Sequence, residues 1–115
     1  MKTIIKSLIF ISILFVNTAY AHVGLESSTP KNNAMLMASP KKLDLNFSGE
    51  VRLIKVVLKK NKGQKIDFGF KPQKQAQKSF SWALPKLSPA NYEVEWTIMG
   101  KDGHLMKNKL GFMVH

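Results

Sequence analysis

Hydrophobic and polar residues alternate with a period of two over much of the chain. The clearest example is YEVEWTI, residues 92–98, where the aromatic and aliphatic side chains share one face and Glu93, Glu95 and Thr97 share the other. Because successive side chains of a β-strand point to opposite faces of the sheet, this alternation predicts a half-buried strand. The same period predicts strands at residues 43–47, 66–70, 80–84 and 110–114, and a denser run of β-branched residues predicts another at 51–60.

Turn-forming residues separate these predicted strands, and no segment has the period of a long amphipathic helix. Some seven short strands at this spacing, within about 95 residues, predict an all-β domain built as a β-sandwich or a barrel. Lysine and glutamine dominate residues 71–78, which we expect to form a solvated loop. The turn signals are TPKNN at 29–33, SPKK at 39–42, NKG at 61–63, LSPAN at 87–91 and KDG at 101–103.

The beginning of the chain differs in composition from the rest. A basic start precedes an almost wholly apolar run from Ser7 to Val16, and AYA at residues 19–21 provides small residues at a cleavage position. This layout is typical of a secretory signal peptide, and the apolar run is shorter than the roughly 20 residues that a membrane span needs. We therefore expect residues 1–21 to be removed and residues 22–115 to form one exported domain that begins at His22.

The chain has no cysteine and carries a large positive charge. Without cysteine it has neither disulfides nor thiolate ligands, so packing or a bound ligand must stabilise this small domain. After loss of Lys2 and Lys6, 16 lysines and arginines remain against 7 aspartates and glutamates, a formal charge of +9. Such a charge attracts nucleic acid, anionic lipid or acidic proteins. Because the lysines are dispersed and alternate with core positions, we interpret them as the solvated face of a sheet and expect no nucleic-acid partner.

Three residues form a candidate metal site: His22, Asp102 and His104. Once cleavage frees its amine, an N-terminal histidine can hold one metal ion through that amine and its imidazole Nδ1. Asp102 and His104 lie two positions apart, so in an extended segment their side chains point to the same side. Nitrogen donors in a plane, completed by a carboxylate or water, are preferred by Cu(II), which also leads the divalent affinity order. An Asp-Gly-His segment is also an ordinary polar turn, and only the fold can bring the two ends of the chain together.

Four segments, in register over the whole mature chain, resemble a known family. They are HVGLESSTPKNNAML, SPKKLDLNFSGEV, LPKLSPANYEVEWTIMGKDGH and the closing GFMV, and they are similar to the CopC family of periplasmic copper-binding proteins. The resemblance implies a Greek-key, immunoglobulin-like β-sandwich that binds one Cu(II) ion through His22, Asp102 and His104. It also implies a periplasmic location, a role in copper resistance or homeostasis, and a CopD-like inner-membrane protein as a partner.

The chain departs from the family pattern in two places. The glycine before the tyrosine of the family pattern is Asn91 here, a residue that also tolerates turn conformations. Some CopC proteins have a separate Cu(I) site built from closely spaced methionines and a histidine in mid-chain, but residues 50–90 contain neither residue type. We therefore expect a single site that binds Cu(II) only.

The methionines and the last histidine have structural explanations. We expect His115 to be a frayed end that does not reach the metal. Methionine commonly fills gaps in a core, and Met106 is the one to follow because it lies two residues from His104. The expected core methionines are Met99, Met106 and Met113, while Met35 and Met37 are expected to flank a loop.

The leading functional interpretation is a monomeric binding protein that captures Cu(II) outside the inner membrane and buffers it or passes it to a partner. A copper-dependent oxidative enzyme is the alternative, because an N-terminal histidine chelate also serves in oxidative polysaccharide cleavage. That chemistry needs an open coordination position and a substrate platform, whereas here Asp102 fills a position and no stripe of exposed aromatic residues is evident. We therefore expect no enzymatic activity. An adhesive or structural sandwich with incidental histidines is the third interpretation.

Overall fold

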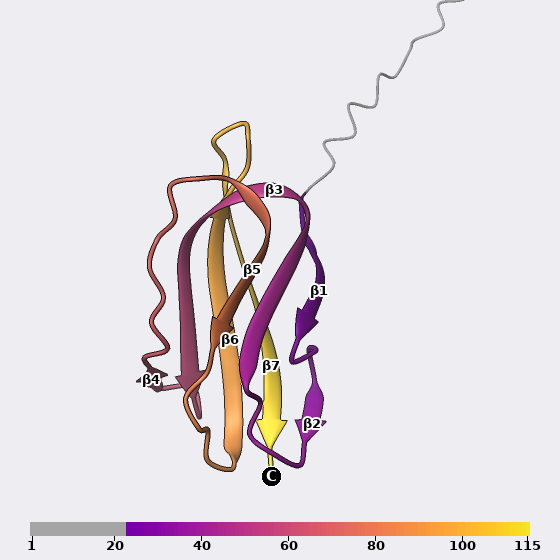
Figure 1. The fold of residues 1–115 in the computed structure, drawn as a ribbon, viewed down its shortest axis with the longest axis vertical. Coiled ribbons are helices and arrows are strands. Elements are labelled where there is room, and N and C mark those ends of the chain that lie inside the picture. The colour runs from indigo at the N-terminus through magenta and orange to yellow at the C-terminus, as the bar shows by residue number, and fades with distance from the viewer. Residues whose placement is uncertain (1–22) are drawn as a thin grey trace, which may run out of the picture.

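The computed structural model describes residues 23–115 and contains seven β-strands in that range (Figure 1). No helix occurs among these residues, and so none that is long and apolar enough to cross a membrane. The predicted all-β domain of about seven strands is confirmed. The strands are β1 (Leu25–Thr29), β2 (Ala34–Leu36), β3 (Lys42–Lys60), β4 (Gln64–Ile66), β5 (Gln77–Ala83), β6 (Ala90–Met99) and β7 (Leu105–Val114).

The strands pack as two layers that share the long strand β3 (Figure 1). The first part of β3 pairs antiparallel with β1 and β5, and its second part pairs antiparallel with β4 and β6. β6 also pairs antiparallel with β7, and β7 pairs parallel with the short strand β2. Because β3 passes from one layer to the other, it fixes the position of the two layers relative to each other.

The structure joins into one strand the two segments that the sequence pattern separates at residues 48–50. β3 runs without a break in its extended backbone, although its pairing with β5 is interrupted between Asn46 and Val51. At this interruption β3 bends and passes from one layer to the other (Figure 1). Gly49 lies within this stretch, and a glycine inside a strand often marks a bend. The expectation of two separate strands was therefore wrong.

The hydrophobic residues of the alternating pattern form one core between the layers. Phe47 contacts Phe80 and Trp96 edge to face, with ring centroids 6.0 Å and 6.3 Å away, an arrangement that aromatic rings favour. The predicted inward faces of residues 92–98 and 110–114 are confirmed. The buried hydrophobic residues are Leu43, Leu45, Phe47, Val51, Leu53, Val56, Leu58, Phe80, Leu87, Tyr92, Val94, Trp96, Ile98, Leu110, Phe112 and Val114.

The predicted strand at residues 66–70 is reduced to its first residue, where β4 ends. The Asp67 carboxylate accepts a hydrogen bond from the Gly69 N–H at 2.9 Å, and Gly69 has a φ of +83°, in the left-handed region. This local turn takes the chain out of the extended conformation, so the strand prediction was wrong beyond β4. The two phenylalanine rings of the segment still pack against Trp82.

The last residue and two of the methionines also differ from expectation. The His115 N–H donates a hydrogen bond to the Leu36 carbonyl at 2.8 Å, so its backbone extends the pairing of β2 with β7 instead of fraying. Met106 packs against the core as predicted. Met99 and Met113 are half-buried and lie outside the core cluster, because each alternates along its strand with a buried residue.

Candidate metal site

Residues 100–104 form the turn that joins β6 to β7 at one end of the molecule (Figure 1). The Gly100 N–H donates to the carbonyl of His104 at 3.1 Å, and the Gly103 N–H donates to the carbonyl of Gly100 at 3.0 Å. Gly103 has a φ of +84°, a conformation that residues with a Cβ adopt only at a cost. The Asp-Gly-His segment is therefore a closed turn whose backbone fixes the positions of its two functional residues.

The side chain of Asp102 contacts His104 through two hydrogen bonds. Its Oδ1 accepts the backbone N–H of His104 at 3.0 Å, and its Oδ2 lies 2.7 Å from Nδ1 of the imidazole. The backbone hydrogen bond, followed by the side-chain one, lowers the pKa of Asp102 below its ordinary value of 3.8. The carboxylate is therefore ionised at neutral pH. Its contribution to the folded turn is present above the ordinary pKa and is lost as the pH falls through the lower folded value.

Both side chains of this pair face solvent. The His104 side chain is 82% exposed and that of Asp102 is 52% exposed. Because Nδ1 faces the carboxylate, Nε2 is the imidazole nitrogen available to a metal ion, and carboxylates commonly orient metal-binding histidines in this way. In residues 23–115 no three histidine, cysteine, aspartate or glutamate side chains gather in one place. The pair itself offers one nitrogen and the carboxylate oxygens.

Gly100 and Met106 lie next to the pair. A Cβ on Gly100 would be 3.2 Å from Oδ1 of Asp102 and 3.5 Å from Cε of Met106. The missing side chain thus lets the carboxylate approach the backbone, with the methionine methyl group beside it. Sequence reasoning missed the role of Gly100, although a glycine directly after a strand pattern is a signal of close backbone approach.

The start of the described chain is anchored on the bend of β3. The Ser48 N–H donates to the Gly24 carbonyl at 2.9 Å, and the Gly24 N–H donates to Oγ of Ser48 at 3.1 Å. Val23 packs against the core, and a Cβ on Gly49 would lie only 3.3 Å from Cγ2 of Val23. The glycine at position 49 therefore makes room for Val23 at this bend.

Strand pairing connects this anchor to the turn. Close behind the bend, Arg52 pairs with Met99, the last residue of β6, and the turn begins at the next position. Figure 1 shows the described chain starting at the same end of the molecule as the connection between β6 and β7. His22 and the predicted signal peptide, residues 1–21, lie outside the described residues. One peptide bond separates His22 from the anchored Val23.

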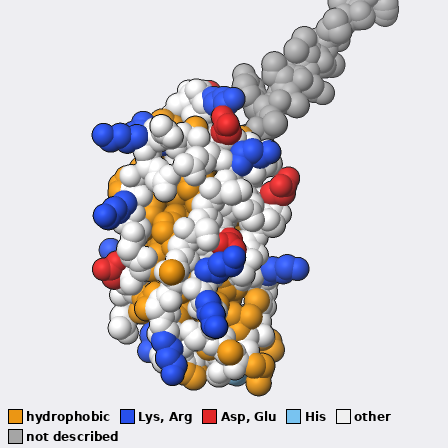
Figure 2. Space-filling model, viewed as in Figure 1, with side chains coloured by type: hydrophobic (Ala, Val, Ile, Leu, Met, Phe, Trp, Pro, Cys, Tyr) orange, Lys and Arg blue, Asp and Glu red, His pale blue; other side chains and the backbone are white. Residues whose placement is uncertain are grey.

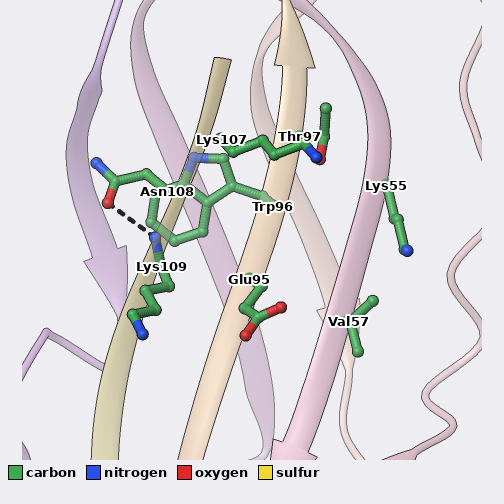
Figure 3. Close-up of a pocket in the computed structure, with 8 residues that line it drawn as sticks. All are labelled: Lys55, Val57, Glu95, Trp96, Thr97, Lys107, Asn108 and Lys109. Atoms are coloured by element: carbon green, nitrogen blue, oxygen red, sulfur yellow. Dashed lines mark hydrogen bonds between the residues drawn. The ribbon is translucent and has the colours of Figure 1, made fainter. Parts of the chain in front are cut away.

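A separate hollow of about 410 Å³ lies over β3, β6 and β7 (Figure 3). Lys59 pairs with Glu95 at 3.2 Å, and the hydrogen bond from this lysine lowers the pKa of Glu95. Lys109 pairs with Glu93 at 3.5 Å. Lysines and arginines are spread over the visible face of the molecule (Figure 2), in agreement with their interpretation as a solvated surface. Of the predicted metal ligands that the structure describes, neither Asp102 nor His104 lines this hollow.

Comparison with known proteins finds one matching family model and relatives that match over most of their length. The family model of the CopC domain matches residues 25–115. The chain is similar to Protein YobA of Escherichia coli (strain K12), with 32% identity over 106 residues that cover 88% of this chain and 85% of the relative. Protein YobA of Shigella flexneri matches with the same identity and coverage.

Solved structures show the same fold. The crystal structure of CopC from Methylosinus trichosporium OB3b matches with a TM-score of 0.67 and 26% identity, over 81% of this chain and 93% of that one. PcoC from Escherichia coli, described as a methionine-rich copper resistance protein, gives a TM-score of 0.65 and 24% identity over 82% and 99%, a likeness of fold. The predicted β-sandwich is confirmed by these matches. With the family model extending over nearly all described residues and relatives matching along most of their length, this chain belongs to the CopC family.

Proposed function

We propose that this chain is a periplasmic copper-binding protein that holds one Cu(II) ion and buffers or delivers it in copper resistance or homeostasis. Membership of the CopC family supports copper as the metal. The proposed ligands are the amine and imidazole of His22, the imidazole of His104 and an oxygen of Asp102. The observation that carries the proposal is that the anchored Val23 and the turn holding Asp102 and His104 lie at one end of the sandwich, linked through β3.

Three nitrogen donors and one oxygen give Cu(II) a planar site of the kind it prefers. Cleavage after Ala21 creates the amine ligand of His22, so export and formation of the site are proposed to be coupled. In the structure Asp102 holds the imidazole of His104 through the 2.7 Å hydrogen bond. We propose that this bond opens when Cu(II) binds, so that an oxygen of Asp102 can complete the plane. Because these four donors fill the plane, we propose a binding protein and not an oxidative enzyme.

The exposure of the turn favours transfer of the ion to another protein. The side chain of His104 is mostly exposed, and the turn stands at the end of the sandwich, away from the closed core. A partner can therefore approach the ligands from solvent without opening the β-sheets. We propose that a CopD-like inner-membrane protein receives the ion and that the chain acts as a monomer.

A Cu(II) titration of the chain that begins at His22 tests this function. The protein is titrated in competition with a chelator of known affinity, and electron paramagnetic resonance of the complex reports the donor atoms. We expect one tightly bound Cu(II) per chain, with hyperfine structure from coordinated nitrogen. A spectrum without nitrogen donors, or no saturable binding of one ion, would contradict the proposal.

The Cu(II) affinity is expected to fall as the pH drops below neutrality. A free α-amino group has an ordinary pKa of about 7.7–8.0 and an imidazole one of about 6.5, so in acid Cu(II) must displace protons from its nitrogen ligands. Asp102 contributes little to this dependence because its lowered pKa keeps it ionised. Competition titrations between about pH 5 and pH 7 measure the effect. A constant affinity over this range would exclude the amine as a ligand.

A further inference from the structure

The outward face of β3, β6 and β7 differs in charge between its two halves. Strand pairing arranges this face in rows that take one residue from each strand. In the half beside the β6–β7 turn, one row has an arginine next to two apolar residues, and the other has a threonine between two lysines. These rows are Arg52–Met99–Leu105 and Lys55–Thr97–Lys107. Both rows carry positive charge, and neither contains a carboxylate.

The residues of these two rows face solvent. Both neighbours of Thr97 in β6, Trp96 and Ile98, are buried, so Thr97 points away from the core. Met106 packs against the core, and Leu105 beside it is 56% exposed. The arginine and the two lysines of the rows are exposed as well. A partner can therefore contact both the charged and the apolar members of the rows.

The other half of the same face has its charges balanced. Lys59 pairs with Glu95 at 3.2 Å. Lys109 pairs with Glu93 at 3.5 Å. Among residues 23–115, the three basic residues of the half beside the turn form no ion pair. The excess positive charge of this face thus lies beside the turn.

The hollow of about 410 Å³ gives the lysine row a concave shape (Figure 3). Lys55, Thr97 and Lys107 all line it, and Figure 3 shows the two lysines on the strands at either side of Thr97. Neighbouring strands lie about 4.8 Å apart, so both ammonium groups can reach a carboxylate above Thr97. Glu95 also lines the hollow, but its carboxylate is held by Lys59. The row therefore offers hydrogen-bond donors to an anion.

This half of the face adjoins the candidate metal site. Met99 ends β6 and pairs with Leu105, which begins β7, so this apolar pair lies between the lysine row and the turn. Lys107 follows His104 by three residues, which span about 10 Å in an extended strand. A partner bound to these rows therefore also reaches the residues that we propose as Cu(II) ligands.

The combination of charge, apolar contact and concave shape fits an acidic segment of a protein. Protein interfaces commonly have an apolar centre within a polar rim. Opposite charges guide the encounter of two proteins and fix their register. A flat anionic membrane would contact the lysine ammonium groups without entering the hollow. A protein segment accounts for all three features, whereas a membrane accounts for the charge alone.

We propose that the two rows beside the turn form the docking surface for an acidic segment of the protein that receives the Cu(II) ion. Carboxylates of the segment meet Lys55 and Lys107 in the hollow, and one of its apolar side chains covers Leu105. This inference deepens the proposed function, on which it rests for the purpose of the docking. Binding of the segment itself needs no copper.

Nuclear magnetic resonance of the copper-free chain that begins at His22 tests the surface without any variant. The probe is a short synthetic peptide that is rich in glutamate and contains one leucine. The backbone N–H resonances of Lys55, Thr97, Leu105 and Lys107 are expected to shift most. Those of β5, in the other layer, are expected to stay in place. Shifts that are largest in β5 would contradict the proposal.

A pair of charge reversals measures the contribution of the lysine row. In Lys55→Glu/Lys107→Glu the peptide affinity is expected to fall at least about tenfold, because each exposed ion pair contributes up to about fivefold and each reversal adds repulsion. Lys78→Glu/Lys86→Glu is the matched control, since it changes the net charge equally at two exposed lysines in β5 and the loop after it. At about 0.1 M salt, charges more than about 10 Å apart are largely screened, so the control should bind nearly normally. Equal losses in the two variants would overturn the proposal, and thermal denaturation checks that both are folded.

Vesicles of phosphatidylglycerol test a membrane as the alternative occupant. We expect both double variants to cosediment with the vesicles equally, because a lipid surface responds to the net charge that they share. Loss of vesicle binding in Lys55→Glu/Lys107→Glu alone, with no shifts from the peptide, would overturn the proposal in favour of lipid. A protein that binds the peptide at this surface but does not bind Cu(II) would contradict the proposed function and leave the docking surface standing.

Discussion

One extra residue in front of His22 is expected to lower the Cu(II) affinity by more than about 100-fold, since even the loss of an outer-shell partner costs roughly 10- to 100-fold. The added residue converts the amine of His22 into a peptide nitrogen. Every side chain stays in place, and Val23 keeps its contact with the bend of β3. The chelate that amine and imidazole form together is the only feature lost.

Equilibrium competition for Cu(II) compares three chains in this experiment. One begins at His22, one has an alanine before His22, and one has the same alanine after His115. The third chain is the matched control, because the addition lies at the other end of the sandwich, and it should bind Cu(II) like the first. Equal affinities of the first two would exclude the amine as a ligand. The intact mass of the protein recovered after expression of residues 1–115 checks in addition whether cleavage follows Ala21.

The strands that could be predicted are those whose alternation continues without interruption. Residues 92–98 bury the predicted face, because a period of two reports directly which side of a strand meets the core. At residues 66–70 the same period was misleading, because Asp67 accepts the N–H of Gly69 and turns the chain. β2 is three residues long, too short for a period to be visible, and it forms by pairing with β7.

The parts of the candidate metal site also differ in whether the sequence could predict them. The contact between Asp102 and His104 is local, and their spacing alone predicts that the two side chains can meet. The anchoring of Val23 depends on the pairing of β1 with β3, which no local pattern reports.

Replacing His104 with alanine is expected to lower the Cu(II) affinity by more than about 100-fold, again beyond the roughly 10- to 100-fold cost of losing an outer-shell partner. The fold should persist, because the side chain is mostly exposed and exposed substitutions usually change stability by less than about 0.5 kcal/mol. The backbone N–H at position 104 can still donate to Oδ1 of Asp102, so the turn is retained. The lost donor is therefore the imidazole alone.

His115→Ala is the matched variant, because it removes an exposed imidazole at the far end of β7. It should leave the Cu(II) affinity unchanged, whereas His104→Ala should lower it. Cu(II) titrations of both variants, together with thermal denaturation, measure the difference. Equal loss of Cu(II) binding in the two variants would refute the assignment of His104. General unfolding of His104→Ala would lower its melting temperature together with its Cu(II) affinity, so an unchanged melting temperature assigns the loss to the missing imidazole.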